Sequence, residues 1–201
     1  MPLPSLRQLA LLVGGCLVLG VGVALLLTAD LGSDGFSTLV NGVTITSGLP
    51  FWVSNLLVSV VFLTLAAARR VRPGVGTVVQ IAIVGGMASV LLERWAIPSA
   101  WQVQVLMLAA ALPVIGVGIT AYLGSRTGAG PVEAAGLAWD PPVPFRWSYS
   151  VVQGGGAVGG WLLGATIGPG TIVVIVVLGP LIDITSRLLR LEIHQGDRVD
   201  S

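Results

Sequence analysis

The chain has 201 residues, of which 54% are hydrophobic and only 9% are charged, and its mean hydropathy is +0.94. Soluble domains carry about 25% charged residues, so this composition excludes a soluble globular domain. A net charge of +1 also excludes nucleic-acid binding, which needs a basic face. With only Cys16 and His194 available, we expect no disulfide, no metal site and no cofactor.

Six apolar segments are long enough to cross about 30 Å of hydrocarbon. The first follows Arg7, exceeds the apolar length of a signal peptide and lacks a cleavage pattern, which favours a retained helix. The residues after Leu191 are polar and form a predicted cytoplasmic tail. The predicted spans cover residues 8–29, 51–68, 77–94, 101–123, 146–165 and 171–189.

Two segments between spans, 31–50 and 127–144, are too polar and too broken by Gly and Pro to cross a membrane. Each contains a short apolar piece, at 36–46 and 132–139, of about half a membrane's depth. These pieces are either half-helices that re-enter from opposite faces or ordinary loops followed by an interfacial helix. We favour re-entry, because interrupted segments at matching positions of two halves indicate a transport site.

The chain repeats itself. Residues 20–32 align with 116–128 at an offset of 96, and three glycines coincide. At an offset of 94, residues 50–54 then align with 144–148 and 74–77 with 168–171. We therefore predict one membrane domain (1–201) made of two repeats, at about 8–95 and 100–190, with 191–201 as the tail.

Topology follows from the count of spans and from the arginines. An odd number of spans per repeat inverts the second copy relative to the first. With the N-terminus in the cytoplasm, nine of the ten Arg residues lie inside and only Arg94 lies outside. An eight-span arrangement would break this pattern. The prediction is a multi-pass protein of the bacterial inner membrane with both termini cytoplasmic.

The fifth span has a face of small residues, which allow helices to approach closely in lipid. We interpret this face as helix packing rather than conduction, against the other repeat or a second protomer, and a homo-oligomer is compatible with it. Its members are Gly156, Gly160 and Gly164.

Two GxGT turns precede the third and sixth spans. Thr suits an N-cap, and free amides at a helix start can hold an anion, but the motif also describes any tight turn that feeds a helix. We favour the turn. Its residues are Gly74, Gly76 and Thr77, and in the second copy Gly168, Gly170 and Thr171.

Asp183 falls within the last span, with Arg187 four residues later. Such a pair lowers the cost of both charges, yet an ionisable group inside a span is also a candidate site residue. Both readings stay open, and Gln153 in the fifth span is a lesser candidate of the same kind. No nucleophile–base set and no ATP-binding loop is present, so we do not expect an enzyme.

The order of glycine motifs resembles the YczE/YitT group of bacterial membrane proteins. The motifs are A-x-LG-x-x-G at 29–35, G-x-G-P at 128–131, WLLG-x-x-x-G-x-GT at 161–171 and GP-x-ID at 179–183. The resemblance implies a multi-pass inner-membrane protein, described as a transporter without assigned activity, and it carries over no catalytic residue. Residues 33–36 depart from the group's pattern, whereas Glu133 fits its acidic position.

The leading hypothesis is a transporter or channel for a small solute or ion, with the lipid bilayer as its surroundings and a path between the repeats. One alternative is a membrane partner or regulator of a biosynthetic or signalling complex that transports nothing. Another is a substrate-binding subunit of an energy-coupling transporter. The predicted path residues are Asp34, Asn41, Glu133, Gln153 and Asp183.

Overall fold

The computed structural model describes residues 4–49, 51–71 and 73–191, and every regular element among them is a helix. The six long helices match the predicted spans to within three residues at each end, and both short apolar pieces are helical. The elements are α1 (Leu6–Thr28), α2 (Gly35–Ser47), α3 (Phe51–Ala68), α4 (Val75–Leu92), α5 (Trp101–Leu123), α6 (Pro131–Leu137), α7 (Phe145–Leu162) and α8 (Pro169–Leu189).

Four described helices, α1, α4, α5 and α8, are long and apolar enough to cross a membrane. Helix α3 is apolar over a shorter described stretch, Val53–Ala68. Helix α7 has 18 residues, but its five glycines dilute its apolar character. This all-helical, strongly apolar composition is typical of a membrane protein.

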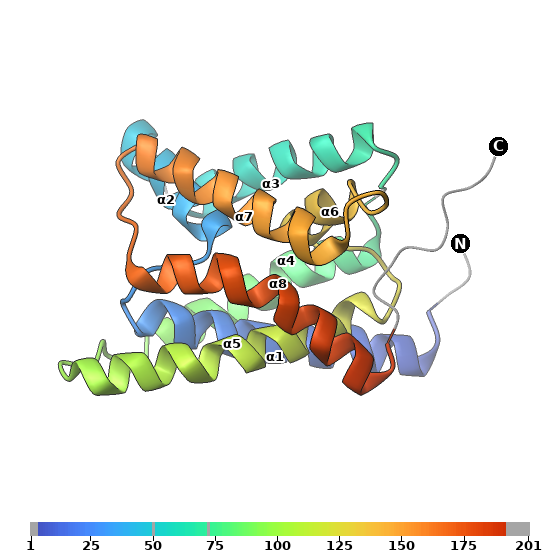
Figure 1. Cartoon of the computed structure of the whole chain (residues 1–201), viewed down its shortest axis with the longest axis horizontal. Coiled ribbons are helices and arrows are strands. Elements are labelled where there is room, and N and C mark those ends of the chain that lie inside the picture. Colours follow the sequence, from blue (N-terminus) through green and yellow to red (C-terminus); the bar gives the residue numbers. More distant parts are fainter. Residues whose placement is uncertain (1–3, 50, 72, 192–201) are drawn as a thin grey trace.

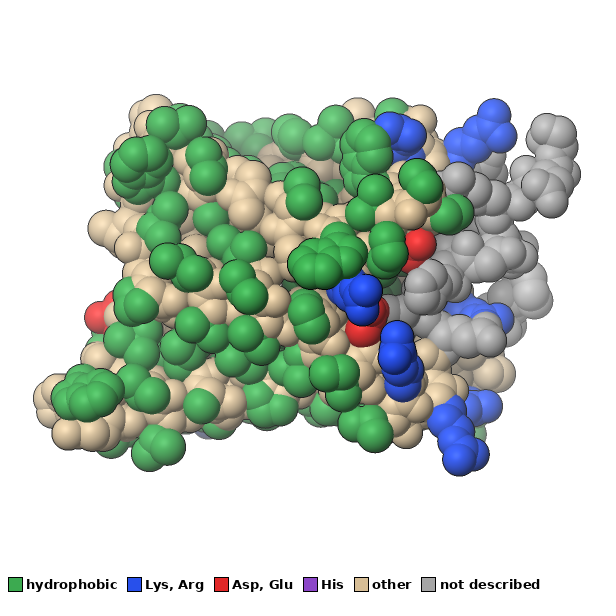
Figure 2. All heavy atoms as spheres, in the orientation of Figure 1, with side chains coloured by type: hydrophobic (Ala, Val, Ile, Leu, Met, Phe, Trp, Pro, Cys, Tyr) green, Lys and Arg blue, Asp and Glu red, His purple; other side chains and the backbone are tan. Residues whose placement is uncertain are grey.

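The outer surface is apolar. Large side chains such as Leu65 (60% exposed), Val176 (62%) and Leu188 (76%) face outwards, and Figure 2 shows hydrophobic groups over most of the visible face. Soluble monomers rarely expose such an extended patch, because it would drive association in water. The Arg side chains visible in Figure 2 gather at the right-hand end, where α1 begins and α8 ends in Figure 1.

The helices pack as two groups. Helix α1 packs on α4 and α5, and α5 packs on α8. The short helices α2 and α6 each pack on both α3 and α7, and α7 joins the groups through α8. In Figure 1, α1, α5 and α8 run along the lower side, and α2, α3, α6 and α7 run along the upper side.

Glycines allow the backbones of α1 and α5 to touch. A Cβ added at Gly15 would lie 2.5 Å from the backbone nitrogen of Tyr122, and one added at Gly118 would lie 2.6 Å from that of Leu19. Cys16, between these contacts, is completely buried. Close backbone approach of this kind stabilises helix pairs where apolar burial contributes little.

Candidate functional site

Helix α2 covers half the length of α7. At its start, the Phe36 N–H donates to the Gln153 Oε1 (3.0 Å), in the middle of α7. At its end, the Thr46 hydroxyl donates to the carbonyl oxygen of Leu163 (2.9 Å), just beyond α7. Figure 1 shows the chain turning inward after α1 and α2 running back towards the same end of the molecule.

Helix α6 lies against the opposite halves of α3 and α7. Gly136 packs on Phe145 and Tyr149 in the first turns of α7. Just after α6, the ring of Trp139 lies 3.9 Å below the guanidinium of Arg69, which follows α3. Helix α6 therefore ends at the end of the molecule opposite to that of α2 (Figure 1).

The GxGT turns hold the chain that leads into each short helix. The Gly76 N–H donates to the Thr127 carbonyl (2.9 Å), and the Gly170 N–H donates to the Leu31 carbonyl (2.7 Å). Glycine is needed for this approach, since a Cβ at Gly170 would lie 2.8 Å from the same Leu31 oxygen. Both amides donate to carbonyl oxygens of the protein itself and are not available to an anion, which favours the turn interpretation over an anion site.

Neither Thr of the GxGT turns stands at the N-cap position, for which the sequence made it suitable. Helix α4 begins at Val75, so Thr77 is its third residue. The Thr77 hydroxyl accepts from the Gly74 N–H (3.1 Å) and donates to the Ala129 carbonyl (2.7 Å), which ties α4 to the chain before α6. In α8 the N-cap is Gly168 without a side-chain bond, and the buried Thr171 hydroxyl has no hydrogen-bond partner among the described residues.

A polar cluster lies where the two short helices begin. Asp34 caps α2, because its Oδ2 accepts from the Ser37 N–H (3.1 Å). Glu133, in the first turn of α6, is only 4% exposed. The two carboxyl groups are close enough to interact electrostatically with each other, and both interact with the hydroxyl of Tyr149.

Two tyrosines and Gln153 complete this cluster. The Tyr122 hydroxyl accepts from the Gly130 N–H (3.2 Å) and hydrogen-bonds the Glu133 side chain. The Gln153 amide donates to the Tyr149 hydroxyl (3.1 Å) while its oxygen binds the start of α2. Gln153 is fully buried, and its bond to the Phe36 N–H holds the start of α2 against α7.

Two predicted path residues lie outside the cluster. Asn41 is exposed on α2 and does not face the carboxyl groups. The Asp183 Oδ2 lies 4.0 Å from the Nε of Arg146 on α7, and this ion pair joins two helices, whereas the sequence suggested a pair with Arg187 on the same helix.

The glycine face of α7 packs on α2. A Cβ at Gly156 would lie 2.7 Å from the Gly35 carbonyl oxygen, and one at Gly160 would lie 2.5 Å from the Thr38 carbonyl carbon. Gly164 does not extend this face. Helix α7 ends at Leu162, and Gly164 adopts a φ of +92°, which favours glycine in the turn that follows.

From the sequence, Tyr122 and Tyr149 were not identified as residues of the cluster. Each stands in an apolar run, where it reads as part of a span. A buried Tyr hydroxyl needs a hydrogen-bond partner, so the two tyrosines that flank the broken segment 127–144 were the available signal.

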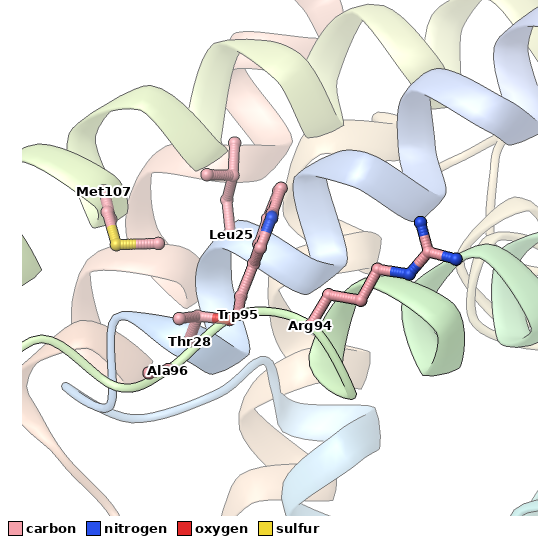
Figure 3. Close-up of a pocket in the computed structure, with 6 residues that line it drawn as sticks. All are labelled: Leu25, Thr28, Arg94, Trp95, Ala96 and Met107. Carbon is pink, nitrogen blue, oxygen red and sulfur yellow. The ribbon is translucent and has the colours of Figure 1, made fainter.

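A separate hollow of about 340 Å³ opens near the ends of α1 and α4, away from the cluster. In Figure 3 the Arg94 side chain points away from Leu25 and Met107. No predicted path residue lines it. Its lining residues are Leu25, Thr28, Arg94, Trp95, Ala96 and Met107.

Known proteins place the chain in a family but give it no activity. An uncharacterised protein of Haemophilus influenzae is 24% identical over 180 residues, which cover 88% of this chain and 82% of that protein. No solved structure gives a significant match. The profile of a family of unknown function, DUF6198, matches residues 6–187. This match spans nearly the whole sequence, and the chain belongs to the DUF6198 family.

Proposed function

We propose that the chain is a transporter or channel for a small solute or ion in the bacterial inner membrane, with its path between two inverted halves. The observation that carries this proposal is the polar cluster. The half-buried Asp34 and the buried Glu133 and Tyr149 lie near enough to interact electrostatically where the two short helices begin, inside an otherwise apolar protein. Buried ionisable groups in a membrane are costly and mark solute pathways by default.

Matched contacts support the inverted repeat. Under the offsets of 96 and 94, Leu31 corresponds to Thr127 and Gly76 to Gly170. The bond from Gly76 to Thr127 and the bond from Gly170 to Leu31 are then the same contact made twice, each between the two halves. The contacts of α2 with α7 and of α6 with α3 form a second matched pair.

Six spans are the proposed topology. Helices α3 and α7 have 18 residues each, which is about 27 Å of helix at 1.5 Å per residue and close to the hydrocarbon thickness. The Arg-rich end faces the cytoplasm in this arrangement. The motifs shared with the YczE/YitT group agree with it, and that relation is part of the proposal.

The proposed path runs past the starts of α2 and α6, with Asp34 and Glu133 as its polar residues and Gln153 as support. Asn41 and Asp183 are left out of the path, because Asn41 is exposed on α2 and Asp183 pairs with Arg146. The rival reading, a membrane partner bound by the glycine face of α7, is weakened because α2 already covers Gly156 and Gly160.

The test is solute flux into liposomes that contain the purified protein, with a panel of ions and small metabolites. We expect one class of solute to enter faster than into empty liposomes, and we expect Glu133→Gln to lose this flux. Asp183→Asn is the matched control, since it neutralises a carboxylate outside the cluster, and it should retain flux. Equal rates in protein-containing and empty liposomes for every solute would refute the proposal.

A further inference from the structure

The two groups of helices meet unequally in the two halves of the chain. The first group is α1, α4, α5 and α8, and the second is α2, α3, α6 and α7. Under the offset of 94, α3 corresponds to α7 and α4 to α8, so two equal halves would join the groups twice. Helix α7 packs on α8, whereas α3 and α4 make no comparable contact within the described residues 51–71 and 73–92.

The contact of α7 with α8 forms at Gly179. This glycine is buried, and a Cβ added to it would clash with the carbonyl oxygen of Arg146 and lie 3.0 Å from the Ser150 Oγ. Its counterpart on α4 is Gly85, which is exposed and at which an added Cβ would meet nothing within 4 Å. Helix α4 thus offers the same small residue for a helix contact, but the contact is not made.

The packing inside the first group is alike in the two halves. A Cβ added to Gly20 of α1 would lie 2.7 Å from the Met87 Cβ of α4, and one added to Gly116 of α5 would lie 3.2 Å from the Leu181 Cγ of α8. Under the offsets of 96 and 94, these two contacts correspond. The halves therefore differ where the groups meet, which is the difference that rocking of one group against the other produces.

An ion pair does not fix this difference. The pair of Arg146 with Asp183 joins α7 to α8, and its counterparts Trp52 and Ser89 cannot form an ion pair. The pair is partly exposed, and such pairs contribute little to stability. The contact of α7 with α8 can therefore open without a large loss of charge pairing.

We propose that the second group rocks against the first, so that α3 closes on α4 at Gly85 when α7 leaves α8 at Gly179. The inference deepens the proposed function, on which it rests, by naming the movement that opens the path to each side in turn. In the proposed topology α7 begins at the cytoplasmic face and α3 at the outer face. The described arrangement is then the outward-open state, and the alternative is the inward-open state.

The test measures the distance between α3 and α4 in the full chain in lipid nanodiscs. Spin labels are attached at the exposed positions Leu57→Cys and Val90→Cys in a Cys16→Ala background and read by double electron–electron resonance. Gly179→Ala should enrich a shorter distance by about fivefold or more, because overpacking disfavours the contact of α7 with α8. Gly85→Ala should deplete that shorter distance by a similar factor, because its methyl group blocks the approach of α3.

Gly86→Ala is the matched control for Gly85→Ala. An added Cβ meets nothing within 4 Å at either position, so the two variants should unfold at the same temperature. The counterpart of Gly86 is Pro180 rather than the contacted glycine of α8. Gly86→Ala should therefore keep the distances of the parent.

A second variant serves where Gly179→Ala does not fold. Leu56 is exposed on α3, and its counterpart at the contact of α7 with α8 is the smaller Ser150. Leu56→Ser should therefore ease the approach of α3 to α4 and enrich the shorter distance. Equal distance distributions in Gly85→Ala and in the folded member of the pair Gly179→Ala and Leu56→Ser would overturn the inference.

Failure of the inference can be told from failure of the transport proposal. Gly85→Ala should lower flux into liposomes by about fivefold or more, and Gly86→Ala should retain it. A change of distance that depends on Gly85, without flux of any solute, would leave the movement standing and refute transport. Equal flux in the parent, Gly85→Ala and Gly86→Ala would leave transport standing and overturn the rocking movement.

Discussion

The contact of α2 with α7 can be tested by adding one methyl group to Gly160. A Cβ there would lie 2.5 Å from the Thr38 carbonyl carbon and 2.8 Å from the Leu39 nitrogen, where ordinary contact begins at 3.4 Å. These atoms belong to the backbone of a helix, so α2 must move as a unit to accept the substitution Gly160→Ala.

Gly155→Ala is the matched control. Gly155 lies on the same helix, and a Cβ added to it meets nothing within 4 Å. Both substitutions give the same gain in helix propensity, so their difference isolates the steric effect. Overpacking of a well-packed contact costs about 1–3 kcal/mol, which corresponds to about a fivefold to 150-fold change in the unfolding equilibrium.

The assay is equilibrium unfolding of the two variants in the same detergent, followed by circular dichroism. We expect Gly160→Ala to be less stable than Gly155→Ala by the amount above. Equal stability of the two variants would refute the reasoning, because α2 would then not lie against this face of α7.

Further predictions concern hydrogen bonds and the ion pair. Thr77→Val should lower the free energy of unfolding by about 1–3 kcal/mol, since it leaves the buried Ala129 carbonyl without its donor. Thr171→Val should be neutral or stabilising, because the Thr171 hydroxyl has no hydrogen-bond partner in the described part of the chain; equal losses in the two variants would contradict this. Gln153→Leu should cost a similar amount, about 1–3 kcal/mol, by leaving the Phe36 N–H without its acceptor, and unchanged unfolding would count against that bond. A double-mutant cycle of Arg146→Gln and Asp183→Asn should give a coupling energy below about 1 kcal/mol, because the pair is partly exposed, whereas a coupling several times larger would show a buried pair.

Helix positions were predictable from the sequence because apolar run length decides them. The predicted spans and the two short pieces match helices within three residues at each end, and Pro131 and Pro169 stand at helix starts. The fifth span was predicted to end at residue 165, three residues beyond the end of α7 at Leu162. The sequence does not distinguish the turn at Gly164 from the glycine face that precedes it.

The candidate site was predictable only in part. The carboxyl groups of Asp34 and Glu133 stood out because charge is rare in this chain. The partner of Glu133 could not be predicted, since Tyr122 comes from another helix and its approach depends on tertiary packing. The outward direction of Asn41 was missed for the same reason, because one short helix does not reveal which of its faces is covered.

In the proposed arrangement α2 and α6 enter from opposite faces of the membrane, and cysteine labelling in intact cells tests this directly. In a Cys16→Ala background, single cysteines replace Leu49, just after α2, and Val143, after α6; both residues are exposed. A membrane-impermeant maleimide should label Leu49→Cys from outside, and it should label Val143→Cys only after the inner membrane is opened. Labelling of both cysteines from the same side, or of Leu49→Cys only from the cytoplasm, would contradict the inverted half-helices.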